Sequence, residues 1–448
     1  MTTMSRRRFL ALAGMAAAGA ACGPSSGGRS STGRASSTTP ATGDGPKTLR
    51  IALRKHFVPA YDDWFDNEFT RRWGDEHGVA VVVDHIQEDE LVARASAEIA
   101  AQSGHDLFGF ISPPPAFEDE VIDHRDIVEE VRAKVGPLLP LVERSILNPK
   151  TGKFFAFSDS WTPGVVHYRS DLWQPLGRLP DTWDSILVAA PSLKAGGHPL
   201  GMGMSPNNID GSGTLMSLLH AYGASVQDEE SRLTINTPAA VEAVRVGAAI
   251  QRAGMTDDIF SWEASSNNRY LAAGTGSLIV NAISALRAIE NQNPQLAGAV
   301  NLAPTPAGPA GRHGVYFVAT FVIWKFSPNQ DLAARFLVDH AIGYREAFER
   351  SRFYNMPSFA GSTPDLAALL GADPSGKYGV LAGATDWTVN LGWPGRANAA
   401  VDQVLNEFIV PDMFRAAARG ERTPAEAVAD AEARMRPIFD RWREQGKV

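Results

Sequence analysis

Leu49-Arg50-Ile51-Ala52-Leu53-Arg54 begins the stretch that decides the fold, because large apolar residues recur at every second position, as in a half-buried β-strand. Val79–Ile86 is a second β-rich run, and Asp106–Ile111 is a third. Helical patterns separate these runs, one from Trp64 to Trp73 and one from Leu91 to Ala101. Strands alternating with helices predict an α/β fold with a parallel sheet and right-handed crossovers.

Three later helices carry recognisable start signals. Thr182 precedes an amphipathic run, and both Ser327 and Thr423 are followed three residues later by Gln or Glu, which predicts capping boxes. Two further strands are expected at Ser277–Asn281 and Val315–Trp324. The α/β pattern therefore continues to the C-terminal region.

Length and charge restrict the class of protein. A chain of 448 residues suggests two or more core-forming units. The formal net charge of -8 argues against a nucleic-acid partner, which would require basic surface for phosphates. A single cysteine excludes an intrachain disulfide and a Cys-x-x-Cys metal or redox site.

The first 22 residues have the features of an export signal. Arg6, Arg7 and Arg8 precede an apolar run, Leu10–Ala21, that is shorter than the roughly 20 residues that span a bilayer. Small residues lead directly to Cys22, the only cysteine. This arrangement resembles a bacterial lipoprotein signal, in which Cys22 would be lipidated, and the arginines resemble a twin-arginine signal. A short N-terminal membrane anchor with an incidental cysteine is the alternative.

Residues 23–47 are rich in Ser, Gly, Thr and Pro and have almost no large apolar side chain. Such a segment cannot bury enough surface to offset its ordering entropy, so we expect a flexible tether. A lipid anchor followed by a tether predicts a globular body held near a membrane, outside the cytoplasm.

Several stretches resemble the carbohydrate-type extracellular solute-binding family of ABC importers, the relatives of maltose-binding protein. The order and spacing of these stretches carry the resemblance; they are Gly152–Phe157, Tyr168–Trp173, Leu179–Asp184, Leu271–Asn281, Ser327–Leu337 and Asn355–Ser358.

The resemblance implies a type II periplasmic-binding-protein-like fold, with two lobes joined by a hinge that the chain crosses several times. One lobe would comprise residues 48–157 and 312–354, and the other 158–311 and 355–448. It also implies a monomer that binds a small solute, expected to be a carbohydrate, between the lobes and delivers it to membrane permease subunits, without cofactor, metal or catalytic residues.

A sugar site needs aromatic platforms for C–H faces and planar polar groups for hydroxyls. Four of the ten tryptophans lie near expected hinge or loop positions and are candidate ligand contacts: Trp161, Trp262, Trp387 and Trp393. A tryptophan is more often part of a core, and packing remains the alternative for each of them.

The polar candidates are Asn208 and Asp210 in a Gly-rich loop, Asn281 at a strand end, Tyr316 before a strand, and His56, with Phe57 beside it, after the first strand. A plain Asx turn is the alternative for Asn208 and Asp210. Relatives often carry a tryptophan soon after the position of Asn281, whereas Ala, Ile and Ser follow it here. That departure suggests a different ligand or platform.

Other functions remain open. No Gly-x-Ser-x-Gly or His-Glu-x-x-His motif supports a hydrolase, although carboxylate pairs of a glycosidase cannot be judged from sequence. A sensory lipoprotein would share the same fold. A glycerol-phosphate-type ligand would need cationic side chains in the cleft, for which Arg287, Arg312 and Arg396 are candidates.

Overall fold

The computed structural model describes residues 47–206, 209–315 and 317–448. The chain divides into two units, Met1–Gly45 and Pro46–Val448, and the described residues all belong to the second. The expected signal, tether and lipidation site at Cys22 lie outside the described residues, as do Asn208 and Tyr316. Among the helices that are described, none is both long and apolar enough to cross a membrane.

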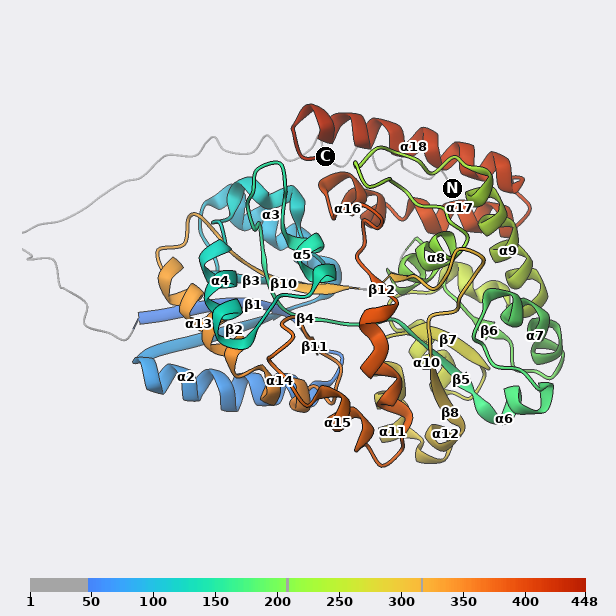
Figure 1. Ribbon diagram of the computed structural model, residues 1–448, viewed down its shortest axis with the longest axis horizontal. Helices are drawn as coiled ribbons and strands as arrows, with labels where there is room; N and C mark the ends of the chain where they lie inside the picture. The colour runs from blue at the N-terminus through green and yellow to red at the C-terminus, as the bar shows by residue number, and fades with distance from the viewer. Residues whose placement is uncertain (1–46, 207–208, 316) are drawn as a thin grey trace, which may run out of the picture. The chain divides into compact units, whose positions relative to one another are not determined.

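A six-stranded sheet forms the centre of the first lobe, in the order β11-β4-β10-β3-β1-β2 (Figure 1). Its strands are β1 (Lys47–Arg54), β2 (Val79–Ile86), β3 (Leu107–Phe110), β4 (Phe157–Trp161), β10 (Val318–Ile323) and β11 (Met356–Pro357). β1 pairs in parallel with β2 and β3, whereas β10 runs antiparallel to β3 and β4. The parallel pairing expected for the first three strands is confirmed, whereas strands that return later in the chain enter the same sheet in the opposite direction.

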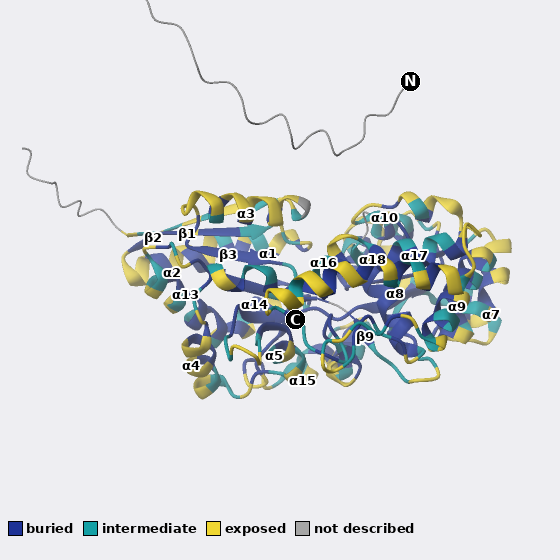
Figure 2. Ribbon diagram, turned by 90° about the horizontal axis from the view of Figure 1, so that it is seen from above, coloured by how far each residue is buried: buried dark blue, intermediate teal, exposed yellow. Residues whose placement is uncertain are grey.

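Helices cover this sheet and bury its apolar side chains. They are α1 (Pro59–Trp64), η2 (Phe65–Phe69), α2 (Thr70–His77), η3 (Glu88–Glu90), α3 (Leu91–Ala101), η4 (Pro115–Glu120), α4 (Arg125–Val135), α5 (Pro140–Ile146), α13 (Gln330–Ile342) and α14 (Tyr344–Arg350). Leu49 and Ile51 of β1 are fully buried, as the alternating pattern predicts. Figure 2 shows the buried strands between helices whose outer faces are exposed.

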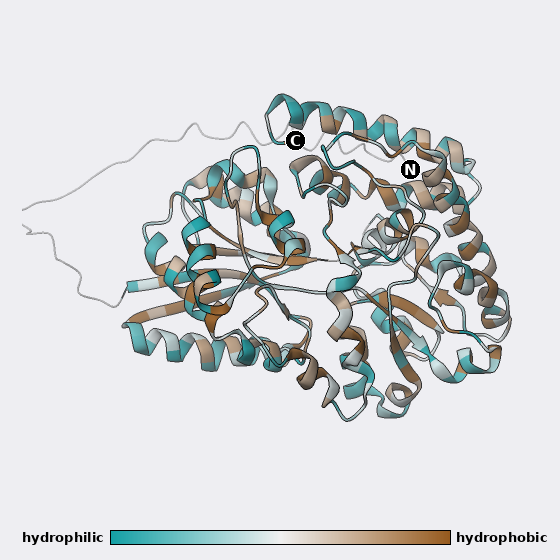
Figure 3. Cartoon of the chain, in the orientation of Figure 1, coloured by the Kyte–Doolittle hydropathy of each residue, from teal (hydrophilic) through white to brown (hydrophobic). Residues whose placement is uncertain are grey.

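A four-stranded sheet, β6-β7-β5-β8, forms the centre of the second lobe. Its strands are β5 (Val165–Arg169), β6 (Leu200–Gly201), β7 (Leu278–Asn281) and β8 (Val300–Pro304), and a separate pair joins β9 (Gly314–Val315) to β12 (Thr388–Val389). The remaining helices are α6 (Ser170–Trp173), η5 (Gln174–Leu176), α7 (Trp183–Ala195), α8 (Ile209–Ala221), α9 (Pro238–Gly254), η6 (Asp257–Ser261), α10 (Ser266–Ala272), α11 (Ser284–Gln292), α12 (Pro294–Ala299), α15 (Leu366–Gly371), η7 (Lys377–Asp386), α16 (Ala399–Asn406), α17 (Ile409–Ala418) and α18 (Pro424–Glu444). Polar and apolar residues alternate along the long helices α9 and α18 (Figure 3), because one side of each packs against α17.

Two of the three predicted helix caps are confirmed. The Thr182 side chain accepts a hydrogen bond from the backbone N–H of Ser185 at 3.0 Å, and Thr423 forms a complete capping box with Glu426. The capping box predicted at Ser327 is wrong. Asn329 is the N-cap of α13, and Ser327 instead donates to the Asp106 carboxylate at 2.6 Å, which ties this turn to the strand β3 region.

The strands fix where the chain passes between the lobes. β4 runs to Trp161 in the six-stranded sheet, and β5 begins at Val165 in the four-stranded sheet. β11, at Met356–Pro357, also belongs to the six-stranded sheet. The limits expected from sequence, 157/158 and 354/355, fall at the start of β4 and just before β11.

Candidate ligand-binding cleft

A cavity of about 1050 Å³ lies between groups from both lobes. The first lobe contributes the segments that directly follow three parallel strands: Lys55–Phe57 after β1, Gln87 and Glu88 after β2, and Ile111 after β3. Ligands of open α/β sheets bind outside the carboxyl ends of the strands, so the topology itself places a binding site here. The second lobe contributes the short segment Glu263–Ser265 and residues of α16.

The inner end of this cleft narrows between the two sheets. Asp210, Asn268 and Asn281 line it from the second lobe, and Tyr354 lines it from the chain segment that leads into β11. Asn267 donates to the Asp210 carboxylate at 3.0 Å, and Asn281 donates to the side-chain oxygen of Asn268. Hydrogen bonds among these side chains hold carboxylate and amide groups in fixed directions at the inner end.

His56 lines the cleft, but its ring is occupied by bonds within the protein. The Val58 N–H donates to Nδ1 at 3.0 Å, so Nε2 carries the proton, and it donates to the side-chain oxygen of Asn355 at 3.1 Å. Burial, reinforced by the nearby Arg54, lowers the pKa of His56 to about 3. His56 therefore remains neutral and fixes the loop after β1 to the segment before β11.

The four candidate tryptophans do not line the cleft. Trp161 is 1% exposed and donates to the backbone oxygen of Pro357 at 3.0 Å, across two strands of the first sheet. Trp387 is also buried, and Trp262 is buried beside Tyr270, immediately before the cleft residue Glu263.

Trp393 is half-buried between two histidines. Its ring stacks on His313 with centroids 4.4 Å apart, and the His220 ring lies 4.9 Å away. This cluster is separate from the residues that line the cleft. Of the nine ligand contacts expected from sequence, the structure thus brings His56, Asp210 and Asn281 together.

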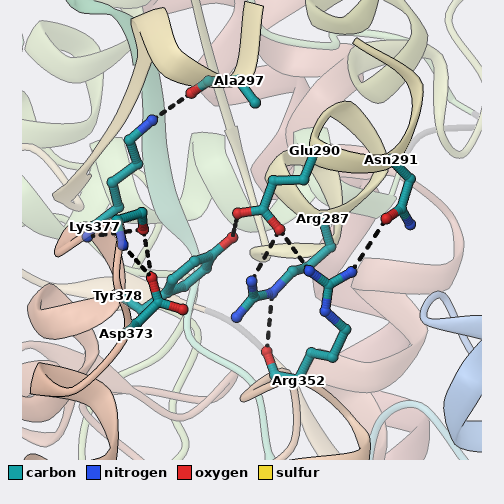
Figure 4. A network of polar contacts seen from close by, with 9 residues as sticks. Arg287, Glu290, Asn291, Ala297, Arg352, Asp373, Lys377 and Tyr378 are labelled. Carbon is teal, nitrogen blue, oxygen red and sulfur yellow. Dashed lines mark hydrogen bonds and ion pairs between the residues drawn. The ribbon is translucent and has the colours of Figure 1, made fainter. Parts of the chain in front are cut away.

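The three candidate arginines also lie away from the cleft lining. Arg287 lies over the Tyr378 ring, 3.6 Å from its centroid, and its guanidinium pairs with Glu290 at 2.9 Å. Figure 4 shows that Arg352 reaches the same Glu290 carboxylate, at 2.8 Å. Arg312 pairs with Asp181, and Arg396 lines a different, smaller cavity.

Several cleft residues follow from topology but were not singled out in the sequence. Glu88 and Ile111 come after strand ends and could have been found by that rule, whereas Asn268, Tyr354 and Asp402 required the three-dimensional arrangement. Burial raises the pKa of the Asp402 carboxyl to about 7. Within residues 47–206, 209–315 and 317–448, no group of three or more His, Cys, Asp or Glu side chains is arranged to hold a metal ion.

The fold and the cleft define the class of two-lobed α/β proteins that bind a small solute between lobes. Residues 59–338 match the family described as bacterial extracellular solute-binding protein, and the chain belongs to this family. The family is extracytoplasmic.

Solved structures share the fold at low sequence identity. The maltose-bound MalE3 of T. maritima superimposes with a TM-score of 0.72 at 18% identity, covering 87% of this chain and 99% of that protein. A sugar transporter from Arthrobacter chlorophenolicus A6 with bound laminaribiose gives a TM-score of 0.74 at 16% identity, covering 87% and 99%.

Curated relatives match over a shorter stretch. An ABC transporter-binding protein of Deinococcus radiodurans is 25% identical over 191 residues, which is 41% of this chain and 44% of the relative. The chain thus spans less than half the length of the curated relatives it matches.

Proposed function

We propose that this protein is the substrate-binding lipoprotein of an ABC transporter, and that it captures a carbohydrate between its lobes and delivers it to membrane permeases. The observation that carries the proposal is the cleft, in which amide and carboxylate groups of the second lobe face an aromatic side chain of the first. The maltose and laminaribiose bound to proteins of the same fold support a sugar as the ligand. The relative from Deinococcus supports the transport role.

The proposal includes closure of the lobes by a hinge motion and no turnover of the ligand. In this proposal the lobe limits lie near those expected from sequence, with one passage at about 161–165, between β4 and β5, and another after β11 at Pro357. The protein acts as a monomer and needs no cofactor.

The test compares the thermal unfolding of the protein, expressed as residues 48–448, with and without maltose or laminaribiose. A ligand that binds only the folded state at a hundredfold excess over Kd stabilises it by about 2.7 kcal/mol. We expect such a stabilisation with at least one disaccharide in thermal unfolding, and its loss in Asp210→Asn. Glu242→Gln, the same chemical change on the outer surface of α9, is the matched control. Equal behaviour of the two variants, or release of monosaccharide from either probe, contradicts the proposal.

The lipid anchor is tested separately in the full-length chain. If Cys22 is lipidated, Cys22→Ser moves the protein from the membrane fraction to the soluble fraction and abolishes incorporation of a labelled fatty acid. A variant that stays in the membrane fraction supports the alternative of an uncleaved N-terminal anchor.

A further inference from the structure

We infer that Phe57 is the aromatic platform of the cleft, and that it recognises the C–H face of a pyranose ring. This inference rests on the proposed sugar-binding function and adds to it the residue that provides ring stacking and the kind of ligand surface that it selects. Phe57 follows β1 on the first lobe and lines both the main cleft and its narrow inner end.

The exposure of Phe57 sets it apart. Phe57 is 37% exposed to solvent, and it is the only aromatic residue among the exposed large apolar residues that the structure describes. The others are aliphatic. Burying a phenyl ring is favourable in proportion to the apolar area removed from water, so an exposed ring inside a cavity gains stability when a ligand covers it. The described tryptophans are all more buried than Phe57, and none of them lines this inner end, although Trp442 lines the main cleft.

The ring of Phe57 is held in place before a ligand arrives. The Arg54 guanidinium lies over it, 4.6 Å from the ring centroid, and the Tyr354 ring lies 6.2 Å away. The neighbouring His56 fixes the backbone of the loop, since its own N–H donates to Asp62 at 2.9 Å. A platform that is already ordered loses little side-chain entropy on binding.

The groups opposite Phe57 complete the recognition of a flat, hydroxyl-rich ring. Asp210, Asn268 and Asn281 line the same inner end from the second lobe. A pyranose with one C–H face on the phenyl ring would direct its equatorial hydroxyls toward these amide and carboxylate groups. Asn281 is followed by Ala282 and Ile283, which are aliphatic and buried, so the second lobe offers no aromatic ring directly after Asn281. In the proposed arrangement, Phe57 of the first lobe supplies that ring.

An acyclic polyol offers hydroxyls but no flat C–H face, and it therefore separates stacking from hydrogen bonding. The experiment measures the affinities of maltose, laminaribiose and the acyclic polyol ribitol by calorimetry for the native protein, Phe57→Leu and Phe57→Trp. We expect Phe57→Leu to weaken the disaccharide that binds by about five- to tenfold, as the loss of an aromatic contact predicts, and Phe57→Trp to retain the affinity within about twofold. Any affinity for ribitol should be the same in all three proteins.

Each other outcome is decisive. Disaccharide affinity that is unchanged in Phe57→Leu, or lost equally in the Leu and Trp variants, overturns the platform while leaving the sugar-binding function intact. If the native protein binds neither disaccharide, the proposed function fails, and the inference fails with it. Because the side chain is exposed, the melting temperature of each variant without ligand should match that of the native protein, which separates binding from folding.

Discussion

The loop after β1, Lys55–Val58, and the segment Trp387–Asn398, called the second segment below, both carry aromatic side chains, but these side chains differ in exposure. In the first, Phe57 remains exposed within the cleft. In the second, Trp387 is 7% exposed, and Trp393 stacks on His313 with His220 beside it. The difference shows that position after a parallel strand predicts a ligand contact better than the type of aromatic residue does.

Hydrogen bonds explain why the second segment folds onto the protein. The amide of Gln227 donates to the backbone oxygens of Gly392 at 2.7 Å and of Arg396 at 2.8 Å, and Asn398 donates to Gln227 in turn. The loop of Phe57 is instead fixed through His56, whose ring points into the protein. One segment thus packs its aromatic residues inward, and the other leaves a ring free for a ligand.

The largest contrast is expected in stability. Trp387→Ala removes a buried indole and should lower the free energy of unfolding by about 3–5 kcal/mol, as large-to-small core substitutions do. Phe57→Ala should change it by less than about 0.5 kcal/mol, because the side chain is exposed. Urea unfolding of both variants measures the two values. A loss below about 1 kcal/mol for Trp387→Ala would show that the indole is not part of the core.

The buried amide of Gln227 gives the next largest effect. Gln227→Ala leaves two backbone oxygens without their donor, and each unsatisfied buried group costs about 1–3 kcal/mol. For the two oxygens together we expect a loss of at least about 2 kcal/mol in urea unfolding, with disaccharide affinity unchanged. Gln445→Ala, at an exposed position after α18, serves as the control and should be close to neutral. Loss of affinity in Gln227→Ala would instead connect this segment to the ligand.

His220, which packs against Trp393 of the second segment, should make the stability of the protein depend on pH. Burial lowers the pKa of His220 to about 3, below its ordinary value of 6.5, so the unfolded state takes up the proton first as the pH falls. The contribution of His220 is complete above about pH 6.5 and is lost toward pH 3, at up to 1.4 kcal/mol per pH unit. Native protein should therefore lose about 1 kcal/mol more than His220→Gln between pH 7.5 and 5.5 in urea unfolding. Parallel stability profiles for the two proteins would contradict this assignment.

Helices and strands whose limits depend on local sequence patterns could be predicted from the sequence. β2 and α3 have the expected limits, and the helical pattern expected from Trp64 to Trp73 lies within a helical stretch that runs from Pro59 to His77 and is capped by Gly78, whose φ of 64° suits glycine. The directions of β10 and β4 were not predictable, because they depend on which strands meet after long connections. The same limit applied to the site. His56 shortly after β1 and Asn281 at the end of β7 could be found from strand ends, whereas the burial of Trp161 and the position of Tyr354 in the cleft depend on how the lobes pack.

Asp402 gives the smallest expected effect and joins the two regions, because it lies on α16, just after the second segment, and lines the cleft. Burial raises its pKa to about 7, above the ordinary value of 3.8, so at higher pH the folded state holds a charge that burial disfavours. This penalty develops as the pH rises from about 4 through 7, and it is absent when both states are protonated. Because the Asp402 side chain is only partly buried, solvent screens most of this penalty, and Asp402→Asn should be only slightly more stable than the native protein at pH 8, an advantage that should disappear near pH 4. Urea unfolding at the two pH values measures it, and an advantage that is equal at both would mean that the carboxylate is solvated despite its position.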